Sequence, residues 1–206
     1  MKLDHVLIAV DDLVGAASTL ASEYRLDAIE GGRHPEWGTA NWIVPLGDAY
    51  LELVGIVDEQ EAKASDFGQW VARAVECGGG PLGWAVRPSD LDSTAHRLSL
   101  DIRSGSRTKP SGESLAWRLA GVNAAARRPW LPFFIDWPEP STFPGRTPDP
   151  NAAIARLEIA GDAGELGAWL GPHQLPLDIR AGDAGLTVVV LEGPHGRVTL
   201  RRETVG

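Results

Sequence analysis

The pattern of apolar and polar positions along the first 58 residues predicts one strand, then a helix, then three more strands. Residues 3–10 are apolar at both alternate positions, as in a strand that is covered on both faces. Apolar residues then recur at helical spacing behind Asp11 and Asp12, which can cap a helix. The predicted segments are a strand at 3–10, a helix at 13–24 and strands at 26–30, 40–46 and 50–56. Gly31 and Gly32 are expected to form a turn. The order is β, α, β, β, β.

The same order of elements returns twice, although sequence identity between the three passes is weak. The second pass predicts a strand at 82–86, a helix at 91–98 and strands at 101–107, 114–120 and 131–137. The third predicts a strand at 154–160, a helix at 162–170 and strands at 177–180, 186–191 and 197–201. We therefore expect a domain over 1–140, made of units 1–58 and 81–140 joined by a helix at 61–77. A Pro-rich connector leads to a third unit over 150–206.

Composition and charge narrow the classes of function. The chain has 206 residues, a net charge of −9 and a pI near 5.0, which argues against a nucleic-acid surface. The short basic stretches at Arg107 and at Arg127 with Arg128 are interpreted as solvated loops. The single cysteine, Cys77, excludes an internal disulfide and a thiolate metal cluster. The acidic, interrupted N-terminal run is neither a signal peptide nor a membrane span, so a cytoplasmic location is expected.

Two polar residues stand out inside apolar strands. Glu52 lies among Val, Leu, Tyr and Ile, where its charge carries a large desolvation cost unless a cation or a proton balances it. His5 is placed in the same way in the first strand. The pair either binds a metal ion or a substrate proton, or forms a hydrogen bond within the core and binds nothing.

A polar and aromatic stretch precedes the strand beside Glu52. Its residues combine an aromatic ring with several hydrogen-bonding side chains, as the rim of a ligand pocket does. They are Arg33, His34, Trp37, Thr39 and Asn41. His34 is also a candidate general base, because histidine titrates near neutral pH. Trp117 and Arg118 alternate in a strand, so one of them faces the cleft. The remaining polar and aromatic candidates are interpreted as solvated or as core residues: His96, His173, His195, Phe133, Phe134 and Trp137.

The repeated units resemble the vicinal oxygen chelate superfamily. More narrowly, LDHVLIAVDDL followed by GGRHPEWGTANWIVPLGDAYLELVGI resembles its glyoxalase-like domain proteins. The resemblance implies an α+β fold in which repeated βαβββ units form curled mixed β-sheets around a cleft, with helices packed outside. It covers residues 1 to about 140 best, and the third unit more loosely.

The resemblance also implies a divalent metal held by side chains from the first and fourth strands of each unit. His5 and Glu52 match these positions in the first unit. The second unit departs from the pattern, because the corresponding first-strand position is Gly83 and the fourth strand offers only Asp136 as a third ligand. In the third unit the position is Arg156, which is not a ligand. Imidazole and carboxylate donors would suit Fe, Mn, Zn or Ni.

Three functions follow as alternatives. The first is a metal-dependent lyase, isomerase or dioxygenase-type enzyme for a small oxygen-bearing organic molecule, with Glu52 and His34 in catalysis and Arg118 beside the rim residues in substrate binding. The second is a metal-free protein that sequesters a small molecule. The third is a purely structural dimer. We expect no nucleic-acid or membrane partner, and a homodimer in any case, because strand edges of the third unit need covering.

Overall fold

The computed structural model describes residues 1–138 and 143–202. Residues 139–142 of the Pro-rich connector and 203–206 of the third unit lie outside the described residues. The first unit comprises β1 (Lys2–Ala9), α1 (Leu13–Tyr24), β2 (Ile29–His34), β3 (Thr39–Pro45) and β4 (Tyr50–Ile56), followed by α2 (Glu59–Ala64) and α3 (Asp66–Glu76). The second comprises β5 (Gly80–Arg87), α4 (Leu91–Leu98), β6 (Ile102–Thr108), β7 (Ser114–Ala120), α5 (Val122–Arg127) and β8 (Phe133–Asp136). The third comprises β9 (Ala153–Ala160), α6 (Ala163–Leu170), β10 (Leu177–Arg180), β11 (Gly185–Gly193) and β12 (Gly196–Arg201).

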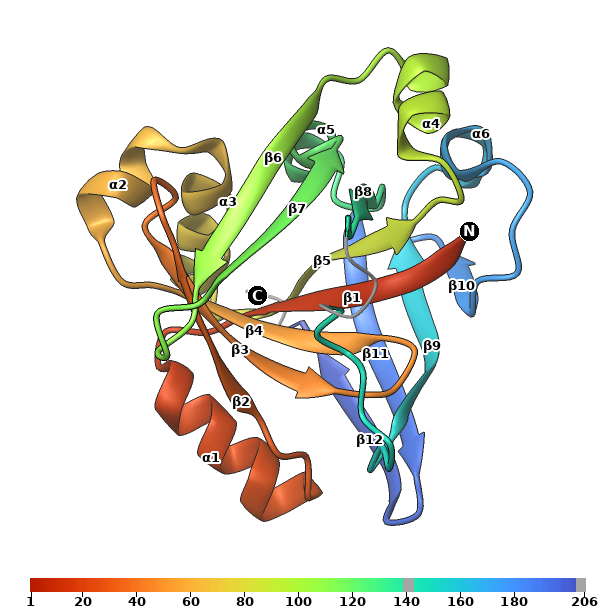
Figure 1. The fold of residues 1–206 in the computed structure, drawn as a ribbon. Helices are drawn as coiled ribbons and strands as arrows, with labels where there is room; N and C mark the ends of the chain where they lie inside the picture. Colours follow the sequence, from red (N-terminus) through yellow and green to blue (C-terminus); the bar gives the residue numbers. More distant parts are fainter. Residues whose placement is uncertain (139–142, 203–206) are drawn as a thin grey trace.

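The strands of the first two units form one closed barrel in the order β1-β4-β3-β2-β6-β7-β8-β5 (Figure 1). In each unit the first and fourth strands run parallel, β1 beside β4 and β5 beside β8. The units meet at two seams of unequal length. Strands β1 and β5 are antiparallel over seven registered pairs, whereas β2 and β6 meet, among the described residues, at the single pair Arg33 with Thr108. The α+β fold of curled sheets with helices outside is confirmed.

The two faces of the barrel strands serve different cores, as the alternation of side chains along a strand requires. Leu7 and Val54 belong to the cluster that fills the barrel, together with Phe67 and Trp70 from α3. Val6 and Leu53 belong to the cluster outside it. The helix α3 therefore covers the barrel from one side, while α1 packs on the outer face.

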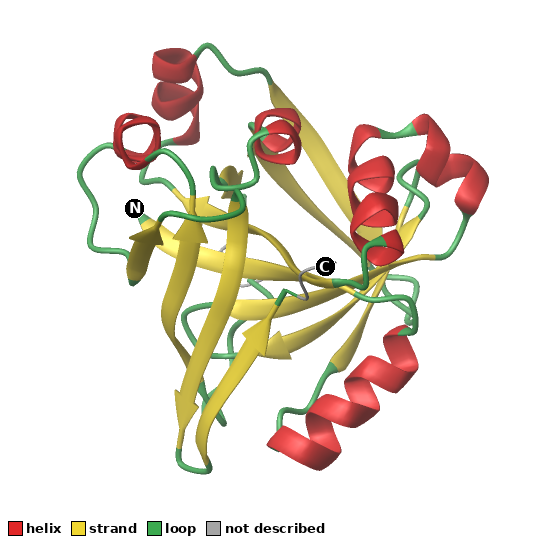
Figure 2. Cartoon of the chain, turned by 180° about the vertical axis from the view of Figure 1, so that it is seen from behind, coloured by secondary structure: helices red, strands yellow, loops and turns green. Residues whose placement is uncertain are grey.

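The third unit forms its own four-stranded sheet in the order β10-β9-β11-β12. This sheet packs beside β5, and Figure 2 shows it from the side opposite to Figure 1. Trp169 of α6 stacks on Phe134 of β8 with ring centroids 5.8 Å apart. Trp84, on the outer face of β5, is fully buried beneath the third unit. A shared apolar core thus joins the appended unit to the barrel.

The second strand differs from the prediction. It spans Ile29–His34 rather than 26–30, so Gly31 and Gly32 lie within the strand and not in a turn. A β-bulge occurs between Glu30 and Gly32, and Gly32 has a φ of +132°, which glycine adopts without strain. A side chain at Gly32 would collide with the backbone of Thr108 in β6. The two glycines therefore permit the close approach of β2 and β6 that closes the barrel.

The helix predicted at 61–77 is divided into α2 and α3. Ser65 separates them with an extended backbone, and its hydroxyl accepts a hydrogen bond from the Gly68 amide at 2.8 Å, which caps α3. All the helices in the described part of the chain are short. None of them is long and apolar enough to cross a membrane.

Candidate functional site

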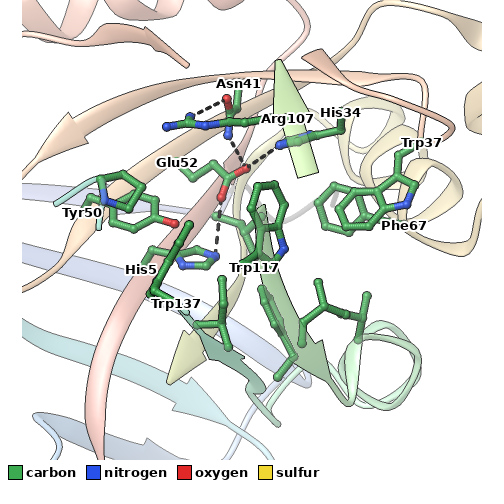
Figure 3. Close-up of a pocket in the computed structure, with 16 residues that line it drawn as sticks. His5, His34, Trp37, Asn41, Tyr50, Glu52, Phe67, Arg107, Trp117 and Trp137 are labelled. Carbon is green, nitrogen blue, oxygen red and sulfur yellow. Dashed lines mark hydrogen bonds and ion pairs between the residues drawn. The ribbon is translucent and has the colours of Figure 1, made fainter. Parts of the chain in front are cut away.

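A cavity lies inside the barrel, and both units contribute to its wall (Figure 3). The volume that the centre of a water molecule can occupy is about 30 Å³, enough for about two waters. The polar residues of the wall are His5, His34, Asn41, Tyr50, Glu52 and Arg107. The apolar part of the wall is mostly aromatic, with Trp37, Phe67, Trp117, Phe133 and Trp137 among its residues.

His5 reaches the cavity from β1, and the neighbouring Asp4 holds its ring. A register shift between Leu3 and His5 leaves Asp4 as an extra residue against β5, and such a bulge breaks the usual alternation of side chains. The Asp4 carboxylate therefore comes within 2.6 Å of His5 Nδ1. Trp137 Nε1 donates to its other oxygen at 3.0 Å, and Arg87 Nε lies 2.8 Å away. Asp4 thus holds the ring at Nδ1, and the Nε2 atom of His5 faces Glu52 in the cavity.

Glu52 reaches the cavity from β4 beside His5. Its Oε2 lies 3.4 Å from His5 Nε2, longer than an ordinary N–H···O hydrogen bond. Its Oε1 accepts a hydrogen bond from Asn41 Nδ2 at 2.8 Å. The carboxylate is only 6% exposed. His5 and Glu52 thus meet inside one cavity, as the sequence predicts.

His34 stands on the other side of Glu52, with its Nε2 3.7 Å from Glu52 Oε1. Its Nδ1 is 2.9 Å from Thr39 Oγ1, a contact made across the β2–β3 hairpin. Burial lowers the pKa of His34 to about 4, although the charge of Glu52 opposes this effect; the charge of Arg107 lowers the pKa further. The imidazole is therefore neutral at pH 7.

Arg107 is a site residue that sequence reasoning missed. Its segment was interpreted as a solvated loop, but Arg107 lies on β6 with its side chain inside the barrel and is only 6% exposed. Its Nη1 donates to Asn41 Oδ1 at 3.0 Å. Arg107 shares a face of β6 with Gly105, which pairs in register with Trp117 of the cavity wall. The second unit thus contributes a guanidinium to the cavity.

The aromatic residues form a continuous wall. Trp37 lies 5.0 Å from Phe67 and 6.4 Å from Trp117, measured between ring centroids, and Trp117 lies 5.6 Å from Trp137. Tyr50 stacks on the His5 ring at 4.7 Å. Burial raises the pKa of Tyr50 well above its ordinary value, and the charges of Asp4 and Glu52 add to this effect. Phe133 and Trp137, interpreted as core from the sequence, line the cavity as well as the core.

Thr39, expected in the rim, is buried behind His34 and does not itself line the cavity. Three further expected site residues lie outside the site. Arg33 is half exposed and pairs with Asp58 and Glu61 beyond the barrel. Arg118 pairs with Asp136 at 2.7 Å, directly across β7 and β8. Both side chains point away from the interior because their neighbours on the opposite face line the cavity. Arg33, Arg118 and Asp136 are therefore not part of the site.

The donors inside the cavity were compared with the needs of a divalent metal. Two ligands of one ion, each at about 2.0–2.2 Å, lie about 3–3.5 Å apart, and His5 Nε2 and Glu52 Oε2 are 3.4 Å apart. A metal-binding histidine typically donates its other nitrogen to a carboxylate, as His5 does to Asp4. Over residues 1–138 and 143–202 no group of three or more His, Cys, Asp or Glu side chains is arranged to hold a metal ion. The fit is that of a two-donor centre.

Several solved structures are similar to this chain. In a comparison with solved structures, a hypothetical protein from Staphylococcus aureus is 14% identical with a TM-score of 0.65, over 98% of this chain and 88% of that one. Methylmalonyl-CoA epimerase from Mycobacterium tuberculosis is 20% identical with a TM-score of 0.47, over 68% and 89%. An epimerase from Streptomyces coelicolor in complex with 2-nitronate-propionyl-CoA is 18% identical with a TM-score of 0.45, over 66% and 94%. The first match shows a shared fold, and the epimerase matches are too weak to indicate a reaction.

The sequence itself matches a family. A comparison with curated proteins finds no match, but the family described as glyoxalase-like domain matches residues 3–174. This range contains both barrel units, the connector and the start of the third unit. The chain belongs to the glyoxalase-like domain family.

Proposed function

We propose that this protein is a lyase or isomerase that acts on a small oxygen-bearing organic molecule, with a divalent metal ion held by His5 and Glu52. The observation that carries the proposal is the pair of facing acceptors. With its proton on Nδ1, His5 presents a lone pair to the Glu52 carboxylate at 3.4 Å. Two acceptors at this distance need a cation between them, and a divalent ion meets that need as a proton does.

The protein's own side chains then have separable roles. Asp4 fixes the ring of His5, and Asn41 fixes the Oε1 atom of Glu52. We assign proton transfer to Oε1, which faces His34, whereas Oε2 faces His5. His34, neutral because burial lowers its pKa to about 4, is a weak base and serves as a hydrogen-bonding partner for a substrate oxygen.

The cavity favours proton transfer in another respect. Its aromatic wall excludes water, so the charge of Glu52 interacts more strongly with the substrate than it would in solution. A bound ion would supply Lewis-acid polarisation of a carbonyl oxygen. Lyase and isomerase reactions that remove a proton beside a carbonyl suit this set of groups.

A second candidate is a metal-free binding protein that sequesters a small molecule. The observation in its favour is the composition of the wall, where aromatic residues outnumber the charged groups and no third metal donor is present among the described side chains.

A pairing of two copies through the strand edges of the third unit stays a prediction, which sedimentation analysis checks.

Metal content separates the two candidates. Protein purified without chelator, after growth with added Fe, Mn, Zn and Ni, should contain about one divalent ion per chain, as ligation by His and carboxylate requires. His5→Gln should lose the ion and keep its fold. His96→Gln, which changes an exposed histidine, is the matched control.

Deuterium exchange at carbon provides the activity readout. Small carbonyl compounds incubated with the loaded protein in D₂O should exchange the hydrogen beside the carbonyl, as followed by proton NMR. Glu52→Gln should abolish this exchange. Wild-type protein that folds normally but takes up no divalent ion contradicts the metal-dependent function and supports the binding protein.

A further inference from the structure

Arg107 brings a buried positive charge to the cavity, and none of the described carboxylates forms an ion pair with it. The residue is 6% exposed, and its described polar contact is the hydrogen bond from Nη1 to Asn41. Its Nε–H is buried and has no hydrogen-bond partner among the described residues. Burying an unpaired guanidinium is strongly unfavourable, because the charge loses its hydration without gaining a partner. A site that keeps such a group has a use for its charge.

Asn41 keeps this charge apart from the nearest carboxylate. Its Oδ1 accepts from Arg107 and its Nδ2 donates to Glu52, so the amide stands between the two ions (Figure 3). A direct Arg107–Glu52 ion pair would satisfy both groups internally. With the amide in between, the guanidinium retains donors for a ligand.

The side chain of Arg107 is held in place by its neighbours. Gly31 of β2 lies against both Arg107 and Asn41, and a methyl group at Gly31 would collide with each side chain. The charge also acts across the cavity, because Arg107 lowers the pKa values of both His34 and Tyr50. The guanidinium is therefore held in place and faces the same space as the proposed reacting groups.

We propose that the cavity binds its substrate through a carboxylate that pairs with Arg107, so that the substrate class is small carboxylic acids. The planar guanidinium presents its donors as a fork that matches the two oxygens of a carboxylate. The small cavity limits the acid to a short chain. That the bound acid is a substrate rests on the proposed function; the binding itself does not.

The probes are acetate and acetamide, which have nearly the same shape and differ in charge. Binding is followed at constant ionic strength by the fluorescence of the tryptophans in the cavity wall and by the thermal midpoint. Wild-type protein should bind acetate saturably, and acetamide at least about tenfold more weakly, since a charge-assisted hydrogen bond is lost. Arg107→Gln should weaken acetate binding by at least about tenfold.

The controls address folding and the metal. Arg73→Gln, at an exposed arginine on α3, should leave acetate binding unchanged. Arg107→Lys keeps the charge without the fork, and it should retain part of the affinity if Arg107→Gln fails to fold. The inference is overturned if wild-type protein binds acetate and acetamide equally or not at all, or if either Arg107 variant, once folded, binds acetate as wild type does.

The same titrations on His5→Gln and on chelator-treated protein separate this inference from the proposed function. Acetate binding that survives both treatments but requires Arg107 supports the carboxylate site even where the metal proposal fails. Acetate binding that depends on His5 and not on Arg107 places the anion on the metal, which overturns this inference and leaves the proposed function standing.

Discussion

His5 and Glu52 face each other across 3.4 Å from neighbouring parallel strands of a closed barrel. His5 pairs in register with Tyr50 and Glu52 with Leu7, so the two side chains lie diagonally on the inner face. Each is held from behind, His5 by Asp4 and Glu52 by Asn41. The pair is therefore held in place by neighbouring side chains, and the contribution of these neighbours can be tested.

Asp4→Asn tests the support behind His5. The substitution removes the negative charge that Arg87 and the His5 ring contact inside the protein. We expect a loss of about 3 kcal/mol in the free energy of unfolding, because a buried charged partner is removed, and a fall in metal affinity of about tenfold or more. Urea unfolding and metal titration measure the two effects. A variant with unchanged metal affinity would show that Asp4 serves stability alone.

Because His34 is buried, we expect the folded protein to lose stability at low pH. Its pKa is about 4 in the folded protein and 6.5 when exposed, so the unfolded chain binds the proton more readily. The free energy of unfolding is therefore unaffected by protonation of His34 above pH 6.5. As the pH falls from 6.5 toward 4, protonation of the unfolded chain lowers this free energy by up to about 3 kcal/mol. Urea unfolding at pH 7.5 and 4.5 measures this loss, and His34→Gln should reduce it. An equal pH dependence in both proteins would contradict the prediction.

Gly31→Ala tests the space that Arg107 and Asn41 require. The added methyl group collides with both side chains, so we expect destabilisation of about 1–3 kcal/mol and weaker acetate binding. Gly167→Ala is the control, because Gly167 lies inside helix α6 with open space around it. That variant should gain about 0.5–1 kcal/mol, the usual difference between glycine and alanine in a helix. Thermal unfolding and fluorescence titration provide the readouts.

Asp136→Asn tests the outer face of the barrel. Asp136 pairs with the partly exposed Arg118, and such surface pairs contribute about 0–1 kcal/mol. Stability and metal content should both stay close to wild type. Loss of the metal in this variant would return Asp136 to the site.

The order of elements could be predicted because each unit buries its helix and strands in a regular periodic pattern. His5 and Glu52 were recognisable because a charged or polar group inside an apolar strand needs a reason. Asp4 was not recognisable, because its role depends on a bulge against β5 that local sequence does not specify. Arg107 also escaped prediction, since its strand becomes part of the cavity only when β6 closes against β2.

Register explains the other differences. A shift of one residue moves a side chain to the opposite face of a sheet, and sequence alone left Asp136 uncertain by that amount. Gly83, which occupies the position of a metal ligand, instead makes room for Trp70: a methyl group there would collide with the indole. The glycine at this position thus serves the packing of α3 against β5.

The unequal seams between the two units have a mechanical consequence. Strands β1 and β5 are held together over seven registered pairs, whereas in the described part of the chain β2 and β6 are held at one. Spreading the ring at that junction breaks the fewest backbone hydrogen bonds, and the loosened strands are those that bear His34 and Arg107. Breathing motions would then enlarge the interior from the side of these two residues while His5 and Glu52 stay anchored on the stiffer half.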